Sequence, residues 1–229
     1  MSHHLRTQSL TRRSLLGGAP AALLARRPAA GQERQRPNIV LFLSDDHSCF
    51  DSSVYGSGVV RTPAMQSLAA GGMVFSNAFT GSPTCVPSRA VIMSGLMPAR
   101  NGALPNHSGL QADIKTLPSY LVEMGYKVAH FGKSHFQPRT NYPDLEWVPS
   151  EIKRGPLNND LDTAAVERWL TSRKSKTGDP VCLIVCSHSP HVYWPENEGY
   201  DPARVELPPT LVDTPETRAV RAQYYTDIT

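Results

Sequence analysis

Three apolar runs in the sequence each end in a cluster of polar residues. The runs are 38–43, 127–131 and 181–186, and the clusters that follow them are Ser44–His47, Gly132–His135 and Ser187–His191. Near-continuous hydrophobicity of this length is typical of strands that are covered on both faces. We therefore expect three buried strands whose carboxyl ends carry polar side chains.

Helical patterns separate these runs. Thr62 followed by Pro63 predicts a capped helix start, because proline suits the first turn of a helix. Apolar residues spaced so that they fall on one face of a helix support this helix and two others. A last helix is expected to begin near Pro215. The apolar positions are Met65, Leu68 and Ala69 in the first helix, Leu117, Tyr120, Leu121 and Met124 in the second, and Leu161, Ala165, Val166, Trp169 and Leu170 in the third. The regions 137–156 and 194–215 are typical of ordered surface loops.

Strands that alternate with helices predict an α/β layered domain with a mostly parallel central sheet. In such sheets, ligands gather beyond the carboxyl ends of the strands. All three polar clusters fall at those ends. We therefore expect a site that is assembled from segments far apart in the sequence.

Charge is distributed unevenly along the 229 residues. The formal net charge is +3, yet residues 1–36 contain seven of the 23 basic residues and one of the 20 acidic residues. The rest of the chain therefore carries a formal charge of −3. A mildly acidic body lacks the basic surface that nucleic-acid binding needs, so we expect no nucleic-acid partner.

The first 31 residues contain Arg12 and Arg13, then a short apolar run and small residues up to a cleavage position near Ala30. This pattern resembles a bacterial twin-arginine export signal, which predicts a periplasmic or extracellular protein. A disordered basic tail is the alternative. The run of about a dozen residues is too short to cross a ~30 Å hydrocarbon core, so we expect no transmembrane segment.

The chain has four cysteines, and two of them, Cys182 and Cys186, lie in one predicted strand. Four residues of strand separate their Cα atoms by roughly 13 Å, which is beyond the reach of a disulfide. Their spacing also differs from that of a zinc knuckle. We expect both side chains to pack in the core.

Cys85 stands at the predicted start of a helix. Pro87 suits the first turn, and an apolar run from Ala90 ends at Gly95. A helix that begins here directs its positive end at residue 85, which favours an anion there. A plain thiol in this position is expected to be a nucleophile of low pKa. The alternative is a cysteine that only packs in a loop.

Asp45 and Asp46 are adjacent carboxylates at a strand end. A hard cation such as Ca²⁺ or Mg²⁺ relieves their mutual repulsion most simply. Two adjacent acidic residues are also common in solvated turns, so this pair alone does not decide between the two interpretations.

The segment Cys85-Val86-Pro87-Ser88-Arg89 matches the C-x-P-S-R signature of the type I sulfatases, and the resemblance extends well beyond it. The stretches RPNIVLFLSDDH, TPAMQSLAAGGMVFSNAF, SGLMPARNG, TLPSYLVEMGY and GKSH occur in the order and at the spacing of that family. The likeness covers about residues 36–229. The stretch WPENEGYDPARVELPPTLVDTPETR most resembles the heparan N-sulfatase-like branch and its bacterial relatives.

The resemblance implies an alkaline-phosphatase-like α/β/α sandwich and the hydrolysis of sulfate from a sulfated carbohydrate. It also implies that a separate enzyme, either a formylglycine-generating or an anaerobic sulfatase-maturating enzyme, converts Cys85 to Cα-formylglycine. The hydrated aldehyde would act as the nucleophile. Ca²⁺ or Mg²⁺ would be held by Asp45, Asp46 and residue 85.

The same resemblance implies roles for further residues. Arg89 would hold the hydrated residue 85, and Lys133 would bind it together with the sulfate oxygens. His135 would assist the proton removal that releases sulfate, and His191 would protonate the leaving group. His188 would be structural or would support the site, and contacts with substrate by His47 and His107 are a weaker expectation.

The family completes its metal site with a downstream Asp followed by Asn or His, adds a second lysine for sulfate, and has a smaller C-terminal subdomain. None of these lies within the 229 residues. We therefore expect residues 36–229 to be the N-terminal portion of a catalytic domain that is truncated at its C-terminus. Two other functions stay open: a phosphoester or phosphonate hydrolase on the same scaffold, and a non-catalytic module that binds sulfated glycans.

Overall fold

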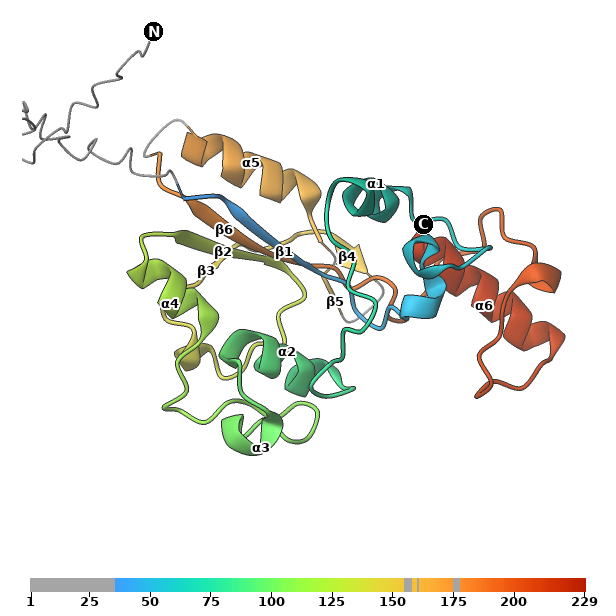
Figure 1. Ribbon diagram of the computed structural model, residues 1–229, viewed down its shortest axis with the longest axis horizontal. Helices are drawn as coiled ribbons and strands as arrows, with labels where there is room; N and C mark the ends of the chain where they lie inside the picture. The colour runs from blue at the N-terminus through green and yellow to red at the C-terminus, as the bar shows by residue number, and fades with distance from the viewer. Residues whose placement is uncertain (1–35, 155–157, 160, 175–177) are drawn as a thin grey trace, which may run out of the picture. The chain divides into compact units, whose positions relative to one another are not determined.

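A parallel sheet lies at the centre of the fold (Figure 1). The computed structural model describes residues 36–154, 158–159, 161–174 and 178–229. Within these residues the sheet has the strand order β1-β6-β2-β3, and every pairing is parallel. The strands are β1 (Ile39–Leu43), β6 (Val181–Cys186), β2 (Lys127–Gly132) and β3 (Glu146–Trp147). The α/β class with a mostly parallel sheet is thereby confirmed.

The register of the strands aligns their carboxyl ends. Cys186 at the end of β6 pairs with Leu43 of β1 on one side and with Gly132 of β2 on the other. The residues that follow each strand therefore leave the sheet side by side. The three polar clusters of the sequence meet at this edge, as expected.

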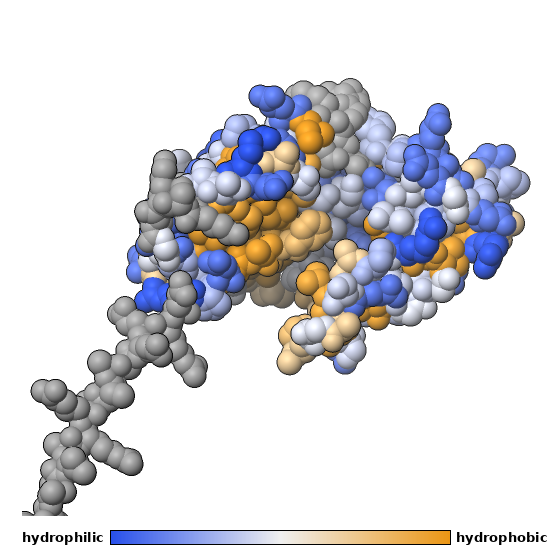
Figure 2. Space-filling model, turned by 90° about the horizontal axis from the view of Figure 1, so that it is seen from above, coloured by the Kyte–Doolittle hydropathy of each residue, from blue (hydrophilic) through white to orange (hydrophobic). Residues whose placement is uncertain are grey.

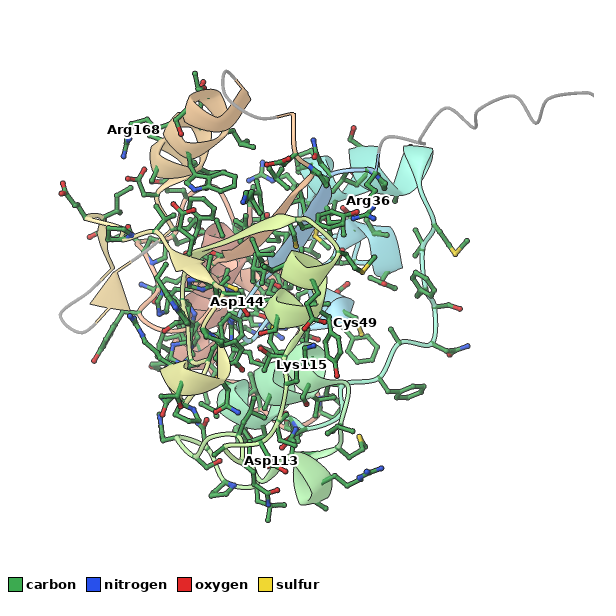
Figure 3. The ribbon with its side chains drawn as sticks, turned by 90° about the vertical axis from the view of Figure 1, so that its left-hand side faces the viewer. Arg36, Cys49, Asp113, Lys115, Asp144 and Arg168 are labelled. Atoms are coloured by element: carbon green, nitrogen blue, oxygen red, sulfur yellow. The ribbon has the colours of Figure 1, made fainter. Side chains whose placement is uncertain are left out.

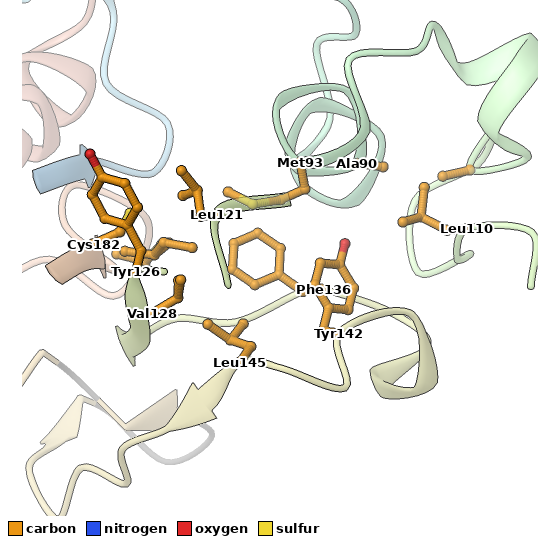
Figure 4. Packing of buried hydrophobic residues seen from close by; sticks show 13 residues of the cluster. Ala90, Met93, Leu110, Leu121, Tyr126, Val128, Phe136, Tyr142, Leu145 and Cys182 are labelled. Atoms are coloured by element: carbon orange, nitrogen blue, oxygen red, sulfur yellow. The ribbon is translucent and has the colours of Figure 1, made fainter. Parts of the chain in front are cut away.

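Helices cover the two faces of the sheet, as Figure 1 shows. One face packs against α2 (Cys85–Ser94) and α4 (Leu117–Glu123). Phe136 and Tyr142 fill the space between these helices and the sheet, where their ring centroids are 5.5 Å apart (Figure 4). The opposite face packs against α5 (Thr163–Lys174), which contributes Trp169. These layers give the α/β/α sandwich.

A third hydrophobic cluster lies around α6 (Pro215–Ile228) and joins Tyr224 and Tyr225 to the loop residues Tyr200 and Val205. The remaining elements are short. They are α1 (Pro63–Gly71), α3 (Pro98–Asn101), the antiparallel pair of β4 (Lys153–Arg154) and β5 (Asn158–Asn159), and the 3-10 turns η2 (Cys49–Asp51), η3 (Ser53–Tyr55), η4 (Arg139–Asn141) and η5 (Pro202–Arg204).

The expectation that all three strands are covered on both faces is wrong for β1. Its side chains alternate, and Val40 and Phe42 are 65% and 58% exposed. Helix α1 forms as expected, but none of its residues is buried, and Leu68 is 77% exposed. Figure 2 shows hydrophobic side chains at the surface on the face seen from above. No described helix packs over the face of β1 that carries Val40 and Phe42.

Three local expectations also need correction. Tyr120 and Met124 of the second predicted helix are each 51% exposed, and Leu121 supplies its main core contact. Thr62 does not cap α1, because its hydroxyl bonds with Ser53 instead. The region 137–156 is not only loop, since it contributes β3, which adds a strand to the sheet beside β2.

Other expectations are confirmed. Cys182 and Cys186 are buried free thiols in the central strand β6. Helix α5 buries Ala165 and Trp169 along its apolar stripe and directs Arg168 away from the sheet (Figure 3). Among the described residues, every helix is too short or too polar to be a membrane span. The predicted export signal lies outside the described residues.

Candidate active site

Helix α2 places Cys85 at the edge of the sheet. The helix begins at Cys85, after Thr84 in an extended conformation, and ends before Gly95, whose φ of 69° is the left-handed geometry that favours glycine. The backbone amide of Val86 donates to Asn106 Oδ1 at 3.3 Å. The first helical residue and its positive helix end therefore face the carboxyl ends of the strands.

The loop after β1 places Asp45 and Asp46 next to residue 85, at the same edge of the sheet. Asp45 is buried, and its amide donates to the carbonyl of Ser189 at 3.0 Å. Asp46 is exposed and has a φ of 60°. One side-chain atom from each of Asp45, Asp46 and Cys85 lies within 4.8 Å of the others. These residues line a cavity of about 410 Å³.

Two cations lie against the buried carboxylate of Asp45. Lys133 Nζ bonds to Oδ2, and Arg89 Nη2 lies 3.6 Å from Oδ1. Burial by itself raises the pKa of Asp45, but the hydrogen bond and charge of Lys133, with Arg89 and His191, outweigh it, so this pKa is below its usual value. Asp45 therefore stays ionised and ties together β1, α2 and the segment after β2.

Gly132 makes the position of Lys133 possible. Its φ is 80°, and a Cβ built on it would lie 2.0 Å from the carbonyl oxygen of Cys186. A side chain here would collide with β6, so only glycine fits. The amide of Lys133 then donates to that same carbonyl at 2.9 Å, and Arg89 Nη1 donates to the Lys133 carbonyl at 3.3 Å.

The expectation of a low-pKa thiol at residue 85 is wrong. Burial raises the pKa of Cys85, and the negative charges of Asp45 and Asp46 raise it further, while Lys133 only partly offsets them. The helix end alone would favour the thiolate, but the two adjacent carboxylates oppose it. As a plain cysteine, residue 85 is therefore a weak nucleophile.

His135 lies beside Lys133 and is half-buried. Burial, followed by the charges of Lys133 and Arg89, lowers the pKa of His135 to about 4. The imidazole is therefore neutral near pH 7 and can accept a proton. It lines a cavity of about 470 Å³ together with Lys133 and His188.

His191 comes to the site from the loop after β6. Its Nε2 atom lies 3.8 Å from Asp46 Oδ2, and its Nδ1 atom lies 2.8 Å from the carbonyl oxygen of Val192. His191 and Asp46 line a third cavity of about 550 Å³, which is walled by Trp194 and Tyr224. His191 therefore borders both the carboxylates and an apolar space.

The three histidines with weaker expected roles, His188, His47 and His107, lie around the site. His188 is buried and lines the cavity of Lys133. His47 Nε2 is bonded to the carbonyl of Asp51 at 3.0 Å, which occupies that nitrogen. The ring of His107 stands edge-on to that of His135, with centroids 5.8 Å apart, and is exposed.

Sequence reasoning missed Tyr224, whose hydroxyl bonds to the backbone of the loop that carries Asp46. It also missed Asn106, which accepts from the first turn of α2. Neither residue lies in a motif or shows a spacing that points to the site, because both contacts join segments that meet only in the folded chain.

Asp45, Asp46 and residue 85 fit a divalent cation in part. The two carboxylates are the hard oxygen donors that Ca²⁺ and Mg²⁺ prefer, whereas the sulfur of an unmodified cysteine is a soft donor that suits neither ion. The set fits well if residue 85 offers oxygen, and it supplies three of the roughly six ligands that these ions need.

The sulfatase family model matches residues 37–228. The chain belongs to the sulfatase family. An ulvan-active sulfatase of Formosa agariphila is 36% identical over 69% of this sulfatase chain and 31% of its own. A human N-sulphoglucosamine sulphohydrolase is 28% identical over 85% of this chain and 45% of its own. Our chain thus spans less than half the length of these two relatives.

Solved structures agree on the fold. A protein in complex with its substrate D-glucosamine-2-N,6-O-disulfate superposes with a TM-score of 0.59 at 24% identity, over 70% of this sulfatase chain and 36% of that protein. A phosphonate monoester hydrolase of Agrobacterium radiobacter gives 0.65 at 19% identity, over 84% and 56%. At these identities the likeness establishes the alkaline-phosphatase-like fold and leaves the substrate open.

The buried histidines next to Lys133 predict how stability responds to acid. Burial lowers the pKa of His130 to about 4, as for His135, from an ordinary value of 6.5. Between these two values the unfolded chain binds protons that the native chain does not, so stability falls as the pH drops from 6.5 to about 4.

Substitution of His130 by Gln should flatten this dependence by up to about 1.4 kcal/mol per pH unit, because one proton-binding site is removed from the unfolded chain. Urea unfolding of both chains at pH 7, 6 and 5 measures the two slopes. Identical slopes would contradict the burial of a neutral His130.

Proposed function

We propose that this protein is a sulfatase that removes sulfate from a sulfated carbohydrate. One observation carries the proposal: residue 85, at the N-terminus of α2, faces the two carboxylates that follow β1 and two buried side-chain cations, Lys133 after β2 and Arg89 of α2 itself. A negatively charged sulfate group placed there would meet the cations while residue 85 attacks its sulfur. Family membership supports this reaction.

We infer that residue 85 works as Cα-formylglycine, made from Cys85 by a separate maturating enzyme. The raised pKa makes the thiol a weak nucleophile in this position. A hydrated aldehyde offers two hydroxyl groups, of which one can attack and the other can lose its proton to release sulfate as the aldehyde forms again. The hydroxyl oxygen also suits a hard cation better than sulfur does.

In this proposal Asp45, Asp46 and residue 85 hold Ca²⁺ or Mg²⁺. When bound, the ion supplies positive charge that lowers the pKa of a hydroxyl on residue 85. The bond between Lys133 and Asp45 means that the carboxylate is shared between the lysine and any bound ion. The ionised state of Asp45 favours this binding.

Lys133 and Arg89 provide fixed positive charge for the reaction. Both side chains are buried, at 3% and 4% exposed, so water screens them little. Lys133 Nζ lies 3.9 Å from Cys85 Sγ, the atom that stands where an oxygen of the hydrate would be. We propose that Lys133 binds the sulfate oxygens and that Arg89 orients residue 85.

The two histidines take opposite roles. His135, neutral near pH 7, is suited to accept the proton of the hydroxyl whose deprotonation releases sulfate. His191 lies 3.8 Å from Asp46 and borders the apolar cavity, where it can donate a proton to the leaving oxygen or nitrogen.

We propose that the sugar of the substrate occupies the cavity of about 550 Å³ beside His191. This volume suits a small carbohydrate. The indole of Trp194 is held in place because its Nε1 donates to the carbonyl of Pro190 at 2.7 Å, and its ring stands edge-on to Tyr224. A fixed aromatic face can pack against the apolar face of a sugar ring. The name of the human relative specifies a sulfated sugar.

A phosphoester or phosphonate hydrolase is the second candidate function. The observation in its favour is the fold likeness to a phosphonate monoester hydrolase. A non-catalytic module that binds sulfated glycans is the third, and it would follow if residue 85 stayed a thiol. The first test below separates all three.

The first test concerns the maturation of residue 85. When the chain is produced together with a maturating enzyme, mass spectrometry should find an aldehyde in the peptide that contains residue 85. The converted full-length protein with CaCl₂ should hydrolyse an aryl sulfate faster than the matching aryl phosphate. Cys85→Ala should abolish turnover and keep the melting temperature, because residue 85 is half-exposed at a loop-helix junction.

Faster turnover of the phosphate would favour the phosphohydrolase. An unconverted thiol and no turnover, with retained binding of a sulfated sugar, would favour the binding module. Loss of folding in Cys85→Ala would indicate a packing role for the cysteine.

The second test concerns the sugar cavity. Trp194→Ala should weaken the binding of N-sulfoglucosamine by about tenfold, because a large apolar contact is lost. Inorganic sulfate, which lacks a sugar and needs only the positive charges of the site, should bind equally to Trp194→Ala and to the unchanged chain. Calorimetric titration measures both constants. Unchanged binding of N-sulfoglucosamine would place the sugar elsewhere, and equal weakening for the two ligands would indicate a disturbed site and also contradict a specific sugar contact.

We also propose that residues 1–31, which lie outside the described residues, direct export through the twin-arginine route. Replacement of Arg12 and Arg13 by lysine should keep the chain in the cytoplasm of a bacterial host. Fractionation followed by immunoblotting measures this, and unchanged export would contradict the proposal.

A further inference from the structure

Helix α6 contacts the loop that carries the candidate metal ligands. The hydroxyl of Tyr224 donates to the carbonyl oxygen of Asp46 at 3.0 Å and accepts from the amide of Ser48 at 3.3 Å. The Tyr224 side chain is buried, which raises its pKa to about 12, so the phenol keeps its proton throughout the neutral range. One side chain thus bonds to the backbone at both ends of a short turn.

This turn contains an unfavourable backbone conformation. Asp46 has a φ of 60°, in the left-handed region that residues other than glycine seldom adopt. Such a conformation persists when the surrounding structure holds it. The bonds from Tyr224 are made to the carbonyl of Asp46 and to the amide two residues on, so they act directly on this turn.

The same helix supports the other flank of the carboxylate pair. Asp227, which lies three residues after Tyr224 on α6, accepts a hydrogen bond from Ser189 Oγ at 3.2 Å. The carbonyl of Ser189 in turn accepts from the amide of Asp45 at 3.0 Å. Residues three apart lie on one face of a helix, so α6 contacts both sides of the pair through a single face.

We propose that Tyr224 is a positioning residue for the metal ligands: it holds the turn at Asp46 so that this carboxylate meets Asp45 and residue 85. The inference rests on the proposed role of these residues in binding a cation. The two hydrogen bonds of Tyr224 to this turn are made with backbone atoms, so the tyrosine supports a ligand and is not itself one. Its loss should therefore weaken the binding of the ion by misplacing Asp46.

Tyr225 is a matched control on the same helix. Its hydroxyl donates to the carbonyl of Glu206 at 3.0 Å and accepts from the amide of that residue at 3.3 Å. The ring is fully buried, like most of Tyr224. Tyr225→Phe therefore removes the same two kinds of bond from the same helix, but these bonds end on the backbone of Glu206 and not on the turn of Asp46.

Calorimetric titration with CaCl₂ of the purified chain, in which residue 85 has been converted by the maturating enzyme, tests the proposal. Tyr224→Phe should bind Ca²⁺ about tenfold more weakly, as expected when a supporting contact of a metal ligand is lost. Tyr225→Phe should bind like the unchanged chain, and Asp46→Asn should lose binding. The melting temperature with and without Ca²⁺ is measured for every chain, and Tyr224→Phe should show a smaller rise than Tyr225→Phe.

The outcomes separate the positioning role from the metal site itself. Equal Ca²⁺ affinity in Tyr224→Phe and the unchanged chain overturns the positioning role while the cation site stands. No Ca²⁺ binding by the unchanged chain overturns the cation site and the positioning role with it. A Tyr224→Phe chain that stays unfolded at every Ca²⁺ concentration, while Tyr225→Phe folds, shows a purely structural tyrosine and also overturns the proposal.

Discussion

The buried carboxylate of Asp45 is the constraint on which the arrangement of the site depends. A charge removed from water is costly unless it is paired, and Lys133 and Arg89 provide that pairing. These three residues come from the end of β1, the segment after β2 and the helix α2. Their mutual attraction fixes the relative positions of three segments that are distant in sequence, and residue 85 is placed by the same contacts because Arg89 lies one helical turn after it.

The parallel sheet makes this meeting possible. Because Leu43, Cys186 and Gly132 are in register, the loops that follow their strands start from one edge. Gly132 then allows the chain to turn tightly beside β6, and Lys133 enters the site. Strand β1 is less protected from solvent, with Val40 and Phe42 exposed, although the loop that follows it carries both carboxylates. Contacts from α6 through Tyr224 and Asp227 support this region from the loop side.

The fold was largely predictable because the signals for it are local. Apolar runs, helical spacing and glycine stops identified the three main strands and the helices near 63, 117, 163 and 215. The exposure of individual side chains was harder to predict. Tyr120 and Phe42 have the apolar spacing of core residues, yet both are exposed, because burial depends on which other segments pack against them. Strand β3 was missed because its two residues are ordered by pairing with β2 and have no pattern of their own.

The sequence by itself determined which chemical groups are present, their order, and the family to which the chain belongs. The C-x-P-S-R segment and the polar residues after each strand were sufficient to name Asp45, Cys85 and Lys133 as one site. The tertiary structure alone decided how these groups titrate and what holds them. The pKa of Cys85 is raised and that of His135 is lowered by burial and by charges from other segments, and Tyr224 reaches Asp46 across most of the chain. Desolvation and Coulomb interactions depend on distances in space, and those distances exist only once the chain has folded.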